Sequence, residues 1–323
     1  MKKILTTLLA LTLSLGAAAF VGCEFISTHT PTEEWQANAT EHWHTCAQEA
    51  CDEKFDPAPH QWAADDAAYC EVCKNYIVDT NEEFAQIIFK DEKAISIVLA
   101  NDVTVDVAAW EAKAFGGATT EKIVVYGEGK TLTFNQTNSD WNHVIMANPN
   151  GTLVLNNVKI TNSGYNDGPW NRHDINFACN VELNNVTSDK AIALKSGAKF
   201  TNVTVNENNG DTYAVWIQPN GQTVEIDGFT VNNAVEGGRG IKIDQQYVDA
   251  PAKVTLKVSN ATFKTNKKAA IIINSAAGAD VTLTAINIAE VNADSVNAVW
   301  VDDSAADYAE LVTVTGGSKI LEP

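Results

Sequence analysis

The sequence predicts an all-β chain whose main body, residues 78–323, is a parallel β-helix with a short N-terminal capping helix and a small Cys-rich module before it. Three observations predict it. Short runs rich in Val, Ile, Thr and Asn recur at intervals of about 20 to 30 residues, the spacing of solenoid coils. One run in each coil has Asn or Gly at the same position. A second run has apolar residues on both sides of a variable one.

The first recurrent position indicates a repeated backbone bend. It is occupied by Asn157, Asn185, Asn202, Gly228 and Asn260. Asn and Gly accept positive φ more readily than other residues, so the column predicts the same bend in each coil. Ala285 breaks the column near the C-terminus. An antiparallel sandwich or barrel is the alternative fold, but it does not need the same bend residue in every repeat.

The second run predicts which side chains face outward. Its flanking residues are apolar, and period-two alternation turns them toward the core while the middle residue points away. The middle positions are Asn176, Ala193, Trp216, Lys242, Ile272 and Trp300. Stacked coils would place these side chains in one line on the outer wall.

A short helix is expected where the β-helix begins. Thr80 and Glu83 have the spacing of a capping box, and Phe84, Ile87 and Ile88 then fall on one helix face. We therefore expect this helix to cap the first coil.

The N-terminus has the order of a secretory signal. Two lysines precede an apolar run over 4–21, and Gly22 and Cys23 follow. This segment resembles a bacterial lipobox, although Phe20 stands where Leu is usual. The resemblance implies that residues 1–22 are removed, that Cys23 is lipidated, and that the chain is exported and anchored to the membrane on the extracytoplasmic side. Secretion without a lipid is the alternative.

Residues 23–40 are expected to be a linker, and residues 41–77 a separate module. This module contains two cysteine pairs, Cys46 with Cys51 and Cys70 with Cys73. Two such pairs predict a tetrahedral zinc site, in which His44 or His60 could replace one sulfur. Two disulfides are the alternative in an oxidising compartment, and free thiols are a third. With zinc or disulfides the role is structural, because so short a segment buries little apolar surface.

The module is similar to a short zinc-ribbon-like module of bacterial surface proteins. The similarity is carried by the Trp-His-x-Cys start at Trp43, by the central His60, and by the closing Cys-x-x-Cys. The first pair departs from that pattern, because four residues separate Cys46 from Cys51.

The charge balance limits the partners. The net charge is −19, and so acidic a surface repels nucleic acid and anionic lipid while it favours solubility or cation binding.

Cys179 follows an inward-facing run and is expected to be a buried small hydrophobic residue.

The Asn column and the variable loop lengths resemble the pectate-lyase-like right-handed β-helix family over roughly residues 80–320. The lyases of that family use carboxylate-bound calcium and an Arg or Lys base. Arg172 and Arg239 are the only arginines, and neither lies in an Arg-x-Pro-x-x-Arg context. Of the family hydrolase signatures, Asp302-Asp303 matches one, Arg239-Gly240-Ile241-Lys242 loosely matches another, and the rest are absent. The motifs therefore favour a non-catalytic protein.

One group of residues supports a catalytic alternative. The positions after the second run include Asp244, Asn274 and Asp302. Two coils separate the two carboxylates by about 10 Å, which suits an inverting acid and base pair. The alternative function is therefore a polysaccharide lyase or hydrolase, with calcium in the lyase case.

A glycan-binding wall is the main functional hypothesis. Trp216 and Trp300 would lie about 14 Å apart in the outward line and could stack on sugar rings. Lys242 would lie between the two rings. The nearby Gln218, Asp244 and Asn274 would bond the hydroxyl groups, and Trp170 from the insertion 163–170 would add an aromatic ring. The other possibility is that a loop or the Cys-rich module covers this wall. The expected function is thus that of a surface lipoprotein that binds a glycan or a surface protein.

Overall fold

The computed structural model divides the chain into two compact units, residues 1–36 with 43–58, and residues 37–42 with 59–323. The residues that it describes are 29–48, 50–64, 66–107, 114–136, 143–164, 174–206, 213–232, 240–244, 254–264, 269–274, 279–284, 287–288, 297–301 and 312–315.

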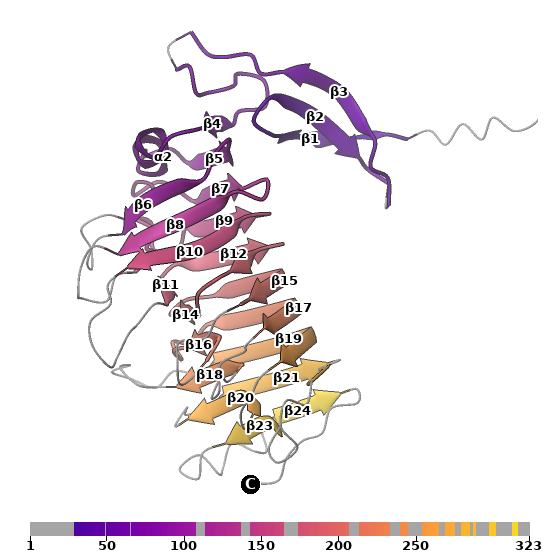
Figure 1. The fold of residues 1–323 in the computed structure, drawn as a ribbon, viewed down its shortest axis with the longest axis vertical. Coiled ribbons are helices and arrows are strands. Elements are labelled where there is room, and N and C mark those ends of the chain that lie inside the picture. Colours follow the sequence, from indigo (N-terminus) through magenta and orange to yellow (C-terminus); the bar gives the residue numbers. More distant parts are fainter. Residues whose placement is uncertain are drawn as a thin grey trace, which may run out of the picture. The chain divides into compact units, whose positions relative to one another are not determined.

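The first unit contains most of a three-stranded sheet with the order β1-β2-β3 (Figure 1). Its strands are β1 (Pro31–Ala37), β2 (Glu41–Cys46) and β3 (Lys54–Pro59). The ring of Trp35 stacks on His44 with centroids 3.7 Å apart. Lys54 Nζ lies 3.6 Å from the centroid of the Trp43 ring. These contacts join the three strands through side chains, which a sheet so small needs for stability.

The second unit is a solenoid of stacked coils, drawn from purple to yellow in Figure 1. One path of parallel strands runs along the whole stack. In spatial order its strands are β4 (Tyr76–Val78), β5 (Ala94–Leu99), β7 (Lys122–Tyr126), β9 (Thr152–Asn156), β12 (Asn180–Asn184), β15 (Ala198–Val205), β17 (Thr223–Asn232), β19 (Val254–Lys264), β21 (Ala279–Thr284) and β24 (Val312–Thr315).

Two further sets of strands complete each coil. The second set is β6 (Val103–Val107), β8 (Thr131–Gln136), β10 (Lys159–Gly164), β13 (Thr187–Ser188) and β22 (Asn287–Ile288), which join the same sheet through β15 and β19. The third is a separate sheet of β11 (Ile175–Phe177), β14 (Ile192–Leu194), β16 (Val215–Ile217), β18 (Ile241–Asp244), β20 (Ala269–Asn274) and β23 (Asn297–Val301). All these pairings are parallel, so the predicted parallel β-helix is confirmed.

The bend column also has the predicted backbone. The φ angles are 49° at Asn157, 53° at Asn185, 53° at Asn202, 69° at Gly228 and 51° at Asn260. Asn202 Nδ2 donates to Asn185 Oδ1 at 3.2 Å. A Cβ added at Gly228 would lie 2.3 Å from Asn202 Oδ1, so a side chain there would require the Asn202 amide to move. Positive φ is thus the feature that the five positions share, and Asn202 and Asn185 add a side-chain hydrogen bond along the solenoid. Ala285 lies outside the described residues.

We expect Asn202→Val to destabilise the protein by about 1–3 kcal/mol, because a β-branched residue is forced into positive φ and the bond to Asn185 is lost. Thr201→Val is the matched control on the neighbouring residue of β15, and it should have a small effect. Urea unfolding of the two variants measures the difference. Equal losses would contradict the importance of the bend.

The capping helix α2 (Asn81–Ile88) forms as predicted. Thr80 Oγ1 accepts a hydrogen bond from Glu83 N at 3.2 Å. Phe84, Ile87 and Ile88 are buried in the same core as the first coils. Of the helices that the structure describes, none is long and apolar enough to cross a bilayer.

The core fills the inside of the solenoid and includes a line of phenylalanine rings. Phe200, Phe229 and Phe263 follow one another with centroids 6.3 and 5.9 Å apart. Cys179 is buried here, as predicted, and burial raises the pKa of its thiol to about 12. A thiol with such a pKa is not a nucleophile at neutral pH.

The solenoid begins inside the segment predicted to be the Cys-rich module. Tyr76 and Ile77 belong to β4, which pairs in parallel with β5. Lys90 Nζ bonds both Asp66 Oδ2 at 3.2 Å and the Tyr76 hydroxyl at 2.9 Å. The second cysteine pair is thus directly continuous with the first coil and packs on it.

Candidate metal centre and outer wall

Four buried side chains form a candidate metal centre: His42, His60, Cys70 and Cys73. One ligand atom from each lies within 4.8 Å of all the others. Cys70 Sγ is 3.7 Å from His42 Nδ1, and Cys73 Sγ is 3.8 Å from His60 Nδ1. Tetrahedral zinc with Zn–S about 2.3 Å and Zn–N about 2.0–2.1 Å requires a separation of about 3.6 Å. The four groups can therefore hold a metal ion with only small movements.

A tight loop presents both sulfurs. Trp62 and Cys70 form an antiparallel bridge, and Glu71 N donates to Gln61 O at 2.8 Å. Lys74 N then donates to Cys70 O at 2.9 Å, and Lys74 itself has φ 59°. This turn closes the Cys-x-x-Cys segment, so that both cysteines face the histidines.

A hydrogen bond orients one of the imidazoles. His60 Nε2 lies 2.8 Å from the carbonyl oxygen of Asn38. A carbonyl can only accept, so this nitrogen carries a proton, and Nδ1 is the ring nitrogen that lies beside Cys73. Histidines that bind metals commonly donate their other ring N–H to a carbonyl in this way.

The electrostatics of the two thiols also suit a cation. Burial raises the pKa of Cys70. Hydrogen bonds from the backbone N–H of Cys73, from the His60 side chain and from other groups outweigh this effect and lower the pKa to about 7. Burial raises the pKa of Cys73, and the neighbouring Cys70 adds to this effect. Two neighbouring buried thiolates repel each other, so both thiols can be deprotonated together only beside a positive charge. A divalent cation with two thiolates and two neutral imidazoles forms a neutral group, which costs least to bury.

The other cysteine pair is not part of this centre. Cys46 and Cys51 form a disulfide with Cα atoms 5.7 Å apart. The expectation that all four cysteines bind one metal is therefore wrong: Cys46 and Cys51 follow the disulfide alternative, whereas Cys70 and Cys73 are free thiols that could hold a metal ion. His60 lies where it could replace a sulfur, whereas His44 stacks on Trp35. His42 was not predicted as a ligand. It directly precedes Trp43, where the zinc-ribbon-like motif begins, and this position could have indicated it.

The outward line of the third sheet has the predicted register. Trp216 pairs with Ala193 on one side and with Lys242 on the other, and Lys242 pairs with Ile272, which pairs with Trp300. Trp216 is nevertheless only 3% exposed and packs with Tyr213, Ala191 and Ala193 in a cluster separate from the main core. The exposure that stacking on a sugar requires is absent at this ring, so the expectation of an open Trp216 is corrected.

The polar neighbours of Trp216 are also covered. Lys242 Nζ and Asp244 Oδ2 form an ion pair at 2.6 Å, with side chains 10% and 9% exposed. The ammonium lies 5.5 Å from the centroid of the Trp216 ring and 5.8 Å from that of Tyr213. These residues hold one another in place, which corrects the expectation that Lys242 and Asp244 stand on an open wall.

Other predicted site residues are only partly described. Asn274 is in register with Asp244, and Trp300 lies on β23, but their side chains lie outside the described parts. Trp170, Asp302 and Cys23 lie outside the described residues altogether. The predicted carboxylate pair and the lipidation site therefore remain predictions.

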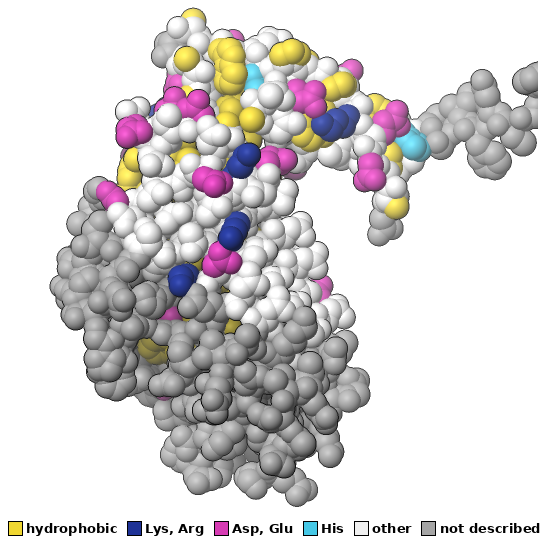
Figure 2. Space-filling model, in the orientation of Figure 1, with side chains coloured by type: hydrophobic (Ala, Val, Ile, Leu, Met, Phe, Trp, Pro, Cys, Tyr) yellow, Lys and Arg dark blue, Asp and Glu magenta, His cyan; other side chains and the backbone are white. Residues whose placement is uncertain are grey.

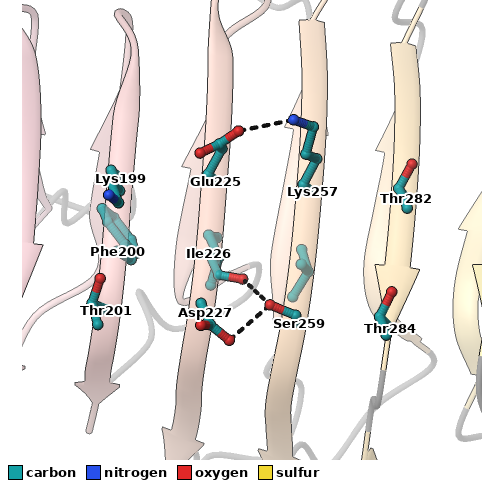
Figure 3. A pocket seen from close by; sticks show the side chains of 11 residues that line it. Lys199, Phe200, Thr201, Glu225, Ile226, Asp227, Lys257, Ser259, Thr282 and Thr284 are labelled. Atoms are coloured by element: carbon teal, nitrogen blue, oxygen red, sulfur yellow. Dashed lines mark hydrogen bonds and ion pairs between the residues drawn. The ribbon is translucent and has the colours of Figure 1, made fainter. Parts of the chain in front are cut away.

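An open groove crosses the outer face of β15, β17, β19 and β21 (Figure 3). Lys257 Nζ bonds Glu225 Oε1 at 2.9 Å, and Ser259 Oγ donates to Asp227 Oδ1 at 2.8 Å. Bonding to Lys257 lowers the pKa of Glu225, and hydrogen bonds from Ser259 and Asn260 lower that of Asp227. Both carboxylates are thus ionised at neutral pH.

The polar side chains of the groove form two rows that follow the strand register. One row is Lys199, Glu225, Lys257 and Thr282, and the other is Thr201, Asp227, Ser259 and Thr284. Figure 2 shows that acidic and basic side chains are interspersed on the described part of the face it draws. Comparison of the chain with protein-family models, with curated proteins and with solved structures finds no match.

Proposed function

We propose that the chain is a non-catalytic surface protein that binds a glycan or another surface partner through the outer wall of its β-helix. The observation that supports this function is the groove over β15 to β21. Its two rows offer ammonium, carboxylate and hydroxyl groups, and successive strands repeat them about every 4.8 Å. Glycan hydroxyls both donate and accept, so a mixed row of this kind is chemically suited to them.

Retention on a glycan array tests the groove. Asp227→Ala removes an acceptor from the centre of the groove and should reduce retention at least tenfold. Asp106→Ala is the control, because this exposed carboxylate lies on β6 in another set of strands. Equal retention by the wild type and the Asp227 variant would exclude the groove as the binding surface.

The same samples distinguish binding from catalysis. Incubation with acidic polysaccharides, with and without calcium, should release neither reducing ends nor unsaturated products. The appearance of either product would replace the proposed function by the polysaccharide lyase or hydrolase alternative.

The centre of His42, His60, Cys70 and Cys73 is proposed to hold a structural zinc ion. Two thiolates and two imidazoles are a common closed zinc ligand set, with no position left for substrate. His60, Cys70 and Cys73 belong to the segment that leads into β4, and His42 lies on β2, so the ion would fix the start of the first coil.

The anchor is proposed from the N-terminal sequence alone. Cys23 would carry the lipid and hold the chain on the extracytoplasmic side of the membrane. We expect Cys23→Ser to release the protein from the membrane fraction or to block removal of residues 1–22. A variant that fractionates and migrates like the wild type would refute the anchor.

A further inference from the structure

A second group of metal-ligand side chains lies in the first unit. His29, Cys46 and Cys51 each offer one ligand atom within 4.8 Å of the others. His29 Nδ1 is 3.3 Å from Cys51 Sγ and 2.8 Å from Glu53 Oε2. One ring nitrogen thus faces both a sulfur and a carboxylate oxygen. Glu53, which contacts His29, is the candidate fourth ligand beside the three side chains that lie close together.

This set suits a borderline divalent cation such as zinc. Cysteine, histidine and glutamate are all zinc ligands. His29 Nδ1 lies 3.3 Å from Cys51 Sγ, close to the about 3.6 Å that a tetrahedral zinc ion requires, and Glu53 would have to move slightly away from the ring to bind the same ion. The set differs from the His42, His60, Cys70 and Cys73 centre in its charge. Two thiolates and one carboxylate around a divalent cation leave a net charge of −1, whereas the first centre is neutral.

We propose that His29, Cys46, Cys51 and Glu53 form a second, redox-controlled zinc site, in which the metal and the Cys46–Cys51 disulfide exclude one another. A dithiol reductant gives two electrons and two protons to the S–S bond and becomes a disulfide itself. The two protein thiols then lose their protons to water as they bind the cation. Oxidation reverses this sequence and releases the metal.

The exposure of the ligands supports such exchange. The side chains of His29 and Glu53 are 31% and 55% exposed, and Cys51 is only partly buried. Reductant and free metal can therefore reach the group. All four ligands of the first centre are buried, so that metal should exchange far more slowly. The two sites differ in chemistry and do not depend on each other.

Metal counting on the purified full chain tests the proposal. One sample is reduced with a phosphine, because dithiols themselves bind zinc, and the other is oxidised; both are then equilibrated with zinc and desalted. We expect about two zinc ions per reduced chain and about one per oxidised chain. Mass spectrometry should show the oxidised chain two hydrogens lighter, and cobalt substitution should add a thiolate-to-cobalt absorption only in the reduced chain.

Matched variants identify the ligands. His29→Ala keeps both cysteines and should hold about one zinc ion in either redox state, whereas Asp52→Asn, which changes an exposed neighbouring carboxylate, should behave like the wild type. Glu53→Gln should weaken the binding of the redox-dependent zinc at least tenfold.

Loss of Cys70 and Cys73 should remove only the redox-independent zinc, so the two sites can fail separately. The same metal content in both redox states of the wild type, or two zinc ions in reduced His29→Ala, would overturn the second site.

Discussion

Removal of metal from the His42, His60, Cys70 and Cys73 centre is expected to unfold residues 59–75 and to loosen β4. Without the cation, two buried thiol groups and two buried imidazoles lose their common partner. Zinc present at 100 times its Kd stabilises the folded state by about 2.7 kcal/mol, and this contribution disappears with a chelator. Hydrogen exchange with and without chelator should show faster exchange at the amides of Cys70, Lys74 and Ile77, which make backbone hydrogen bonds in this segment.

The substitution Cys73→Ser should reproduce the effect of the chelator and lower the redox-independent zinc content from about one ion per chain to near zero. Glu71→Ala is the matched control, because this side chain lies in the same loop and is exposed. Exchange rates in β17 should stay unchanged in both variants. If the chelator removes zinc without altering exchange around Cys70, the ion does not fix the first coil.

Loss of the carboxylate at Asp244 is expected to destabilise the protein by about 3–5 kcal/mol. Asp244→Ala removes the carboxylate that lies 2.6 Å from the ammonium of Lys242, whose side chain is 10% exposed, and a buried charge that loses such a partner is costly. The rings of Trp216 and Tyr213 lie more than 5 Å from the ammonium and replace only part of this interaction. Urea unfolding measures the loss.

The double variant Lys242→Met with Asp244→Leu is the control for this pair. It removes both charges and keeps similar volumes, so most of the stability should return. Asp227→Ala, on the open groove, loses only exposed hydrogen bonds from Ser259 and Asn260, so it should cost about 1 kcal/mol, clearly less than Asp244→Ala. A loss below about 1 kcal/mol in Asp244→Ala would mean that solvent screens the pair.

The fold could be predicted from particular residues because their information is local. Asn157, Asn185, Asn202 and Asn260 adopt positive φ, as their column indicates. The alternation around Trp216 and Lys242 gave the correct pairing register between β16 and β18. Thr80 and Glu83 located the start of α2. In each case the residues of a short segment restrict the backbone of that same segment, so a single sequence is enough for the prediction.

The candidate sites were predicted less well. The Cys70-x-x-Cys73 spacing indicated two of the four side chains that could hold a metal ion, since the chain itself brings those sulfurs together. Cys46 and Cys51 have a similar spacing, yet they form a disulfide beside His29. Spacing alone does not distinguish the two outcomes, because a disulfide and a metal pair both need two cysteines within a few ångström.

The sequence by itself determined the stacked parallel coils, their bends and the helix that begins them. Backbone sterics and side-chain alternation act over a few residues and need no partner. Only the tertiary structure decided which groups meet and which are covered. His42 reaches Cys70 from 28 residues away, and Trp216 points outward from its strand but is buried beside Tyr213. Ligand sets and exposure depend on segments that approach through space, and no local pattern encodes that approach.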